Sequence, residues 1–196
     1  SCSAATDRIR GSPSPAASAG TLPRTLLRCY LLDVLFGRDG EINEIGVALQ
    51  RAREGSASVM RISGDPGIGK TALLDIAEEM ATSDGMAVVR LTAIESESAI
   101  PSSALDLLLD RLGHRPETPG SPAALLEALS LASRRGPLAV LVDDIQWLDD
   151  RSMTALAFAC RRLLADPVAV VLVCQPSAAA DTPFGSFPLV TLKPLS

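Results

Sequence analysis

The segment SGDPGIGKTALL, residues 63–74, decides the fold of this chain. It follows SVMRI (residues 58–62), whose composition predicts a strand, and it continues into a run of residues typical of a helix. Four of its positions fit the pattern G-x-x-x-x-G-K-[ST], which binds phosphate groups when it lies between a strand and a helix. These positions are Gly64, Gly69, Lys70 and Thr71. The segment therefore predicts a phosphate-binding loop and not a plain surface turn.

Each part of this loop has a physical task. The glycines permit backbone angles that turn successive N–H groups toward one anion, and the helix that follows adds its positive end. We expect Lys70 to reach the outer phosphates and to take part in catalysis, and the Thr71 hydroxyl to bind Mg²⁺. The predicted nucleotide-binding residues here are Gly64, Asp65, Pro66, Gly67, Ile68, Gly69, Lys70, Thr71 and Ala72.

A second motif, LAVLVDDIQWLDD, covers residues 138–150. Its first five residues are all apolar, which is typical of a strand covered on both faces. Asp143 follows this strand and is predicted to bind Mg²⁺. Asp144 is predicted to orient or deprotonate the attacking water, although a plain role at the start of the next helix stays open. Asp149 and Asp150 are expected to cap that helix.

The rest of the chain alternates between strand and helix patterns. The predicted strands are residues 58–62, 86–91, 138–142, 168–173 and 188–192; the predicted helices are 41–53, 70–81, 152–165 and two between 101 and 135. Ser103 with Asp106, and Ser121, are expected to cap those two. This alternation predicts an α/β fold with a parallel sheet and helices on both faces. Ligands of such sheets bind beyond the carboxyl ends of the strands, where the loop at residues 64–71 lies.

Composition limits the functions that this segment can have. A net charge of −5 among 196 residues argues against direct nucleic-acid binding, which needs clustered Lys and Arg. No apolar run is long enough to span a membrane, and none of the four cysteines shows C-x-x-C spacing, so we expect a cytoplasmic protein. Residues 1–35 are expected to be a flexible lead-in, because about the first 24 are rich in Ser, Ala, Pro and Gly.

Five stretches together resemble one known family. They are LFGRDGEI, GDPGIGKTALL, ESESAIP, VLVDDIQWLD and LVTLKPLS. They are similar to the ATPase module of large ATP-binding LuxR-type transcriptional regulators. This module belongs to the signal-transducing P-loop ATPases with numerous domains (STAND), close to the AAA modules of origin-recognition type. The resemblance covers about residues 35–196.

The resemblance implies a three-layer P-loop NTPase fold at residues 36–196, with a five-stranded, mostly parallel sheet in the order 5-1-4-3-2. The strand at 168–173 would then lie between the loop strand and the strand that ends at Asp143. Phe36, Gly37 and Arg38 would lie near the adenine and ribose. The implied cofactors are ATP or ADP with Mg²⁺, and the implied partners are neighbouring regulator domains, with self-association left open.

Two departures from the family pattern suggest slow hydrolysis or none. Gln175 stands near the place of an arginine that senses the γ-phosphate, and it is predicted to bind the nucleotide there. Its neutral amide can hydrogen-bond a phosphate but cannot offset the phosphate charge. Asp144 stands where many AAA ATPases have a longer glutamate. The chain also stops where the family continues into a helical lid, so we expect a regulator core without its lid and DNA-binding domains.

Two other functions stay open. A degenerate P-loop scaffold would keep the fold without using ATP, and Gln175 favours this alternative. A small-molecule kinase would need an acceptor site, for which the helical segment at residues 101–135 is the candidate.

Overall fold

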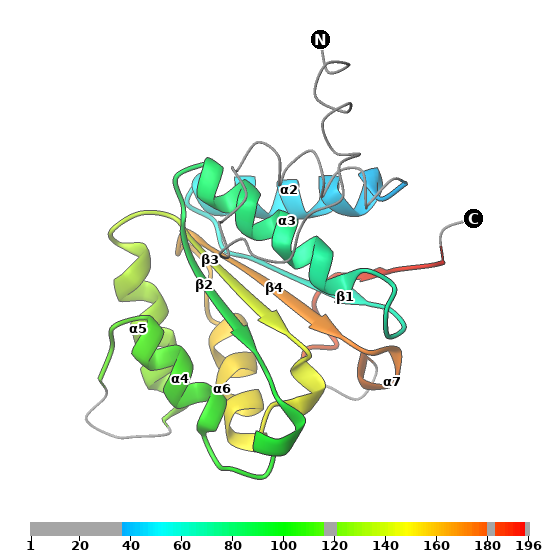
Figure 1. Cartoon of the computed structure of the whole chain (residues 1–196). Helices are drawn as coiled ribbons and strands as arrows, with labels where there is room; N and C mark the ends of the chain where they lie inside the picture. The colour runs from blue at the N-terminus through cyan, green and yellow to red at the C-terminus, as the bar shows by residue number, and fades with distance from the viewer. Residues whose placement is uncertain (1–36, 116–120, 180–182, 195–196) are drawn as a thin grey trace, which may run out of the picture.

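One sheet of five strands lies between two layers of helices in the computed structural model, which describes residues 37–115, 121–179 and 183–194 (Figure 1). The lead-in expected at residues 1–35 lies outside these ranges. The strands are β1 (Ser58–Ser63), β2 (Ala87–Thr92), β3 (Leu138–Asp143), β4 (Val168–Cys174) and β5 (Leu189–Thr191). The helices are α2 (Asp39–Arg53), α3 (Lys70–Ser83), α4 (Ser103–Arg111), α5 (Pro122–Ser133), α6 (Asp150–Cys160) and α7 (Pro176–Ala179), with 3₁₀ turns η2 (Glu95–Glu97) and η3 (Ile145–Trp147).

The strand order is β2-β3-β4-β1-β5, and every neighbouring pair is parallel. The order implied by the resemblance is therefore confirmed, with β4 between the loop strand β1 and the acidic strand β3. Because all five strands run the same way, the loop after β1 and the acidic pair after β3 lie at the same edge of the sheet. The figure shows this edge at the arrowheads of β3 and β4 (Figure 1).

Alternate residues of the buried strands point to opposite faces of the sheet. Along β3, Ala139 and Leu141 pack with α2 and α3, whereas Val140 and Val142 pack with α4, α5 and α6. The same alternation holds along β4, whose seven residues are all buried. Figure 1 shows α2 and α3 on one face and α4, α5 and α6 on the other. Asp143 continues the Ala139–Leu141 alternation, so its side chain points toward α3.

The helix predicted at residues 152–165 is shorter than expected. It ends at Cys160, and Leu163 turns into the core, where it is 4% exposed. No helix in the described ranges is long and apolar enough to cross a membrane.

The expected caps are partly right. Asp149 caps α6, as predicted, by accepting the N–H groups of Arg151 and Ser152. The capping box predicted at Ser103 does not form: the N-cap of α4 is Ser102, which makes no side-chain cap. Ser121 does precede α5, but its side chain makes no cap hydrogen bond either.

A candidate phosphate-binding site at the carboxyl edge of the sheet

The loop between β1 and α3 has a backbone that only glycine fits well at three positions. Gly67 and Gly69 have φ angles of 79° and 101°, in the left-handed region that side chains disfavour. Gly64 has no room for a side chain, since a Cβ there would lie 2.8 Å from Ile68 Cγ2 and 3.0 Å from Leu192 Cβ. The loop is therefore tightly folded: its backbone angles favour glycine at two of these positions, and lack of space favours it at the third.

Lys70 lies under this loop and is only 7% exposed. Its Nζ donates hydrogen bonds to the carbonyl oxygens of Gly64, at 2.7 Å, and Asp65, at 2.8 Å. These two bonds use two of the three N–H donors of the ammonium group within the loop itself. A phosphate in the loop would offer a charged acceptor in exchange for neutral carbonyls, and charge-assisted hydrogen bonds are the stronger kind.

Thr71 and Asp143 meet although 72 residues separate them in sequence. The Thr71 hydroxyl donates to Asp143 Oδ2 at 2.9 Å, and the Asp144 N–H donates to Asp143 Oδ1 at 3.0 Å. A hydroxyl and a carboxylate are hard oxygen donors, and Mg²⁺ in proteins is usually held by one or two such groups together with phosphates and water. The donor set thus fits the metal that the sequence predicts here.

The pKa of the Asp143 carboxyl is raised above its ordinary value. Burial is the largest cause, since the side chain is 3% exposed, and the nearby Asp144 charge also raises it. The hydrogen bond from Thr71 acts in the opposite direction without cancelling these effects. A cation beside a buried carboxylate would stabilise its charged form. The raised pKa of Asp143 is therefore consistent with a cation-binding site.

Asp144 has an unusual backbone for a residue other than glycine, with φ 54° and ψ 47°. Its Oδ1 accepts a hydrogen bond from Gln146 Nε2 at 2.8 Å, and Gln146 Oε1 accepts the Gln175 N–H at 3.2 Å. Gln175 follows the end of β4, so the structure brings the two predicted residues Asp144 and Gln175 to either side of Gln146. The sequence did not single out Gln146, because its role depends on β4 lying next to β3.

Arg38 precedes α2 and contacts the loop. It is 3% exposed; its Nη1 pairs with Glu41 at 3.0 Å and its Nη2 donates to the Ile68 carbonyl at 3.4 Å. Its Nε is buried and has no hydrogen-bond partner among the residues that the structure describes. The contact ties the start of α2 to the loop, while the expected place of Arg38 beside adenine stays a prediction. Phe36, expected there too, lies outside the described residues.

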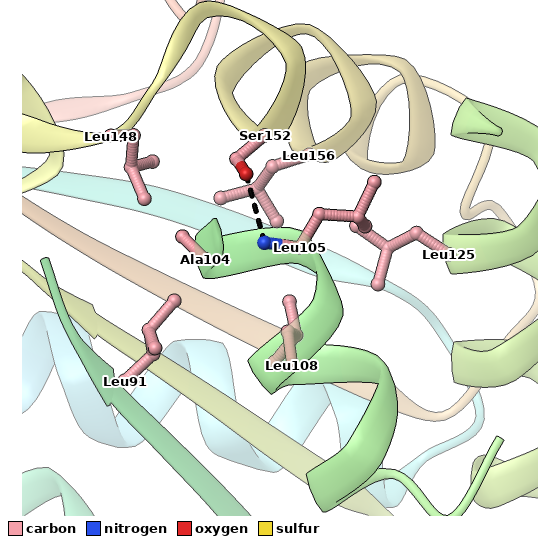
Figure 2. Close-up of a pocket in the computed structure, with 8 residues that line it drawn as sticks. All are labelled: Leu91, Ala104, Leu105, Leu108, Leu125, Leu148, Ser152 and Leu156. Atoms are coloured by element: carbon pink, nitrogen blue, oxygen red, sulfur yellow. Dashed lines mark hydrogen bonds between the residues drawn. The ribbon is translucent and has the colours of Figure 1, made fainter. Parts of the chain in front are cut away.

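A cavity between β2, α4, α5 and α6 is separate from this site. It has a volume of about 10 Å³ and is lined mainly by leucines, with Ser152 as its polar member (Figure 2). The Ser152 Oγ accepts the Leu105 N–H at 2.8 Å, as the dashed line in Figure 2 shows. A space of this size holds one water at most, so it is a packing gap and not a ligand site.

Comparisons with known proteins agree with this geometry. Residues 34–172 match the sequence family described as AAA ATPase domain. A protein of Rhizobium meliloti (strain 1021), itself uncharacterized, is 27% identical in an alignment of 195 residues that covers 75% of this chain and 19% of that protein. The chain thus spans about a fifth of this relative's length.

Solved structures share the fold. The Drosophila ORC bound to DNA has a TM-score of 0.60 at 20% identity, over 94% of this chain and 52% of that one. Cdc6p from Pyrobaculum aerophilum has a TM-score of 0.53 at 18% identity, over 93% and 48%. The chain spans about half the length of each, and identities this low show the fold alone. With its family match over most of the sequence and its parallel P-loop architecture, this chain belongs to the AAA ATPase domain family.

Proposed function

We propose that this chain is the ATP- and Mg²⁺-binding switch module of a LuxR-type transcriptional regulator, with slow hydrolysis or none. The contact between Thr71 and Asp143 is the observation that carries the nucleotide part of this proposal. It joins the end of the phosphate-binding pattern to the end of the acidic strand, at one edge of the sheet. Two motifs that lie 72 residues apart in the sequence thus meet at one point, as a shared ligand would require.

The residues of this edge have distinct tasks in the proposed complex. The backbone N–H groups from Gly64 to Thr71 bind the phosphates, and Lys70 exchanges its two carbonyl partners for phosphate oxygens. Thr71 and Asp143 hold Mg²⁺, which supplies positive charge against the phosphates. Arg38 fixes the loop from the side of α2 through the Ile68 carbonyl.

Slow hydrolysis is supported by the state of Asp144. Its carboxylate already accepts a hydrogen bond from Gln146, and its short side chain extends from a left-handed backbone. Gln175 adds no positive charge at the end of β4. A general base needs to reach the attacking water, so an acid that is short and already engaged favours binding over turnover.

The regulator part rests on the five stretches quoted above and on length. The relative from Rhizobium meliloti is about five times longer than the matched region. We place the ATPase core at residues 36–196 of a longer protein, where neighbouring domains would read its nucleotide state. A reducing cytoplasm is the proposed compartment, in keeping with the buried free thiols of Cys160 and Cys174.

A thermal-shift titration with Mg-ATP tests nucleotide binding. A ligand at 100 times its Kd adds about 2.7 kcal/mol to the free energy of unfolding, so the melting temperature of the wild type should rise. Lys70→Ala should abolish this rise. Arg135→Ala removes an exposed cation just before β3, at the opposite edge of the sheet from the loop, and should leave the rise intact. A wild type that Mg-ATP does not stabilise contradicts the proposal and favours the degenerate scaffold.

The kinase alternative has less support in this structure. The helical segment that was its candidate acceptor site, α4 and α5, packs into the core through Leu105, Leu108, Leu125 and Leu129. The cavity beside these helices is too small for a substrate (Figure 2). A kinase would consume ATP only when an acceptor is added, which the same purified protein can be assayed for.

A further inference from the structure

The side chain of Gln146 connects two parts of the site, the end of β4 and the end of β3. The backbone hydrogen bonds within η3 do not join these two strand ends. The Gln146 side chain accepts from the Gln175 N–H, after β4, and donates to the Asp144 carboxylate, after β3. We propose that Gln146 is a positioning residue that couples the carboxyl end of β4 to Asp144 and to the η3 turn, so that nucleotide binding changes the environment of Trp147. This inference rests on the proposed function and adds the regulation of the same site.

The amide of Gln146 can have only one orientation in this chain. A backbone N–H can only donate, so the Gln146 oxygen must face Gln175. An ionised carboxylate can only accept, so the Gln146 nitrogen must face Asp144. Turning the amide over would break both bonds at once. A shift at either end therefore moves the other, which a side chain with a single polar contact would not do.

Both ends of this link touch the predicted nucleotide site. Cys174 pairs with Ser63 in the parallel register of β4 and β1, so Gln175 lies beside the start of the phosphate-binding loop. At the other end, the Asp144 N–H donates to Asp143, which also accepts the Thr71 hydroxyl. A phosphate in the loop and a cation at Asp143 would thus reach Gln146 by two different routes.

The η3 turn is built to register such a shift. Ile145, the first residue of the turn, is fully buried. Asp149, two residues after the end of the turn, is only 4% exposed and holds the start of α6 in place. Directly before Ile145, the backbone of Asp144 is in the disfavoured left-handed region, which the hydrogen bond from Gln146 helps to hold. Trp147 is half-buried in the same turn and packs against the core on the α4–α6 face.

Trp147 makes the proposal measurable without any hydrolysis. It is the single tryptophan of the sequence, so tryptophan emission reports on η3 alone. In the wild-type chain, Mg-ATP should change this emission over the same concentrations at which it raises the melting temperature. In Gln146→Met the rise in melting temperature should persist, because the hydrogen bonds of the Gln146 side chain go to Asp144 and Gln175 and not to the loop or Asp143. The emission change should fall about fivefold or more, since both polar contacts of the link are lost.

Two further variants make the comparison strict. Gln146→Glu has the same shape and keeps the acceptor for the Gln175 N–H, but it faces Asp144 with a like charge, so it should also lose the emission change. Gln50→Met is the matched control: Gln50 Nε2 likewise donates to a carboxylate, Glu54 Oε1, at 2.8 Å, but on the exposed end of α2. It should behave as the wild type in both measurements.

The outcomes separate this inference from the proposed function. If Mg-ATP does not raise the wild-type melting temperature, nucleotide binding is wrong and the coupling falls with it. If the melting temperature rises but the emission of Trp147 stays constant, binding stands and the coupling is overturned. A full emission change in Gln146→Met or Gln146→Glu also overturns it, because Gln146 would then transmit nothing.

Discussion

Gly64 shows at the scale of one residue why the loop pattern requires glycine. It does not have a positive φ, so conformational freedom is not the reason; the lack of space is. The missing Cβ leaves room for Ile68 from within the loop and for Leu192, which follows β5. The first glycine of the pattern thus serves close packing of the loop against the edge of the sheet, which in turn shapes the proposed phosphate site.

Gly64→Ala should therefore abolish stabilisation by Mg-ATP. Its Cβ would approach Ile68 Cγ2 to 2.8 Å, so the loop must shift, and the N–H groups that are proposed to bind the phosphates shift with it. Gly40→Ala, where a Cβ meets nothing within 4 Å, is the control and should keep full stabilisation. The measurement is the rise in melting temperature with Mg-ATP. An unchanged rise in Gly64→Ala would mean that the loop does not hold the phosphates.

Asp143 opposes the folding of the ligand-free protein, and Asp143→Asn should relieve this. A carboxyl with a raised pKa in the folded state weakens stability once the pH exceeds its usual value, since its charged form is disfavoured by burial. Asparagine can keep both contacts, accepting the Asp144 N–H and donating to the Thr71 hydroxyl.

The expected result is a higher melting temperature without ligand at pH 7, a gain that shrinks as the pH falls toward the range in which Asp143 is protonated. Stabilisation that depends on Mg²⁺ should disappear at the same time, because a neutral amide replaces the anionic metal ligand. Melting curves with and without Mg-ATP measure both effects. A variant that is less stable without ligand would show that Asp143 has a mainly structural role.

At the scale of elements, Asp149 joins α6 to α4. Its Oδ1 accepts the N–H groups of Ser102, Arg151 and Ser152 at 2.8, 3.1 and 3.0 Å, and its Oδ2 accepts the Ser152 hydroxyl. The sequence predicted the cap of α6, because Asp before a helix is a local signal. It could not predict the contact with Ser102, which lies 47 residues earlier and uses a left-handed backbone with φ 65°.

Asp149→Ala should lower the free energy of unfolding by about 2 kcal/mol, the upper range for a lost helix cap. Asp150→Ala, which removes the exposed neighbour in the first turn of α6, should change it by less than about 0.5 kcal/mol. Chemical denaturation at pH 7 measures both. Equal effects of the two substitutions would contradict the special role of Asp149.

The stability that Asp149 contributes should depend on pH in the acid range. Burial raises the pKa of Asp149, but the hydrogen bonds from Ser152 and Ser102 outweigh it, so its pKa lies below the ordinary value. A carboxyl with a lowered pKa contributes stability that is complete above its unfolded pKa of about 3.9 and is lost as the pH falls through the folded pKa. The gap in stability between wild type and Asp149→Ala should therefore close below about pH 4, whereas a gap that is constant down to lower pH would exclude this titration.

At the scale of the whole molecule, the sequence predicted much of the fold because its signals are local. Uniformly apolar runs such as residues 168–173 reveal strands covered on both faces, and the loop pattern marks one end of the sheet. The order of the strands came from resemblance, since nothing in residues 168–173 says which neighbours they choose. The contact of Gln146 with Gln175 follows only once that order is known, which is why the sequence alone did not reveal it.

Arg61 connects β1 to the segment before the edge strand β5, a long-range contact that no local sequence pattern predicts. It lies on β1, is 4% exposed, and donates to the carbonyl oxygens of Ala179, Gly185 and Phe187. These carbonyls belong to the connection between β4 and β5. One side chain of β1 therefore holds the segment that leads into the edge strand β5. The strand then leads to Leu192, whose N–H donates to the Ser63 carbonyl at 2.7 Å, directly before the loop.

Arg61→Met should keep the apolar stem but leave these carbonyls without their donors, which lowers the free energy of unfolding by about 1–3 kcal/mol. The loss should be uneven. Hydrogen exchange should quicken first at residues 184–192 and only later in β1, β3 and β4, because edge segments open before the core. Arg51→Met, on the exposed side of α2, is the matched control and should leave the exchange pattern unchanged. Since Leu192 packs against the loop, stabilisation by Mg-ATP should weaken as β5 loosens; uniform exchange with undiminished nucleotide stabilisation would show that Arg61 supports the core as a whole and not this edge.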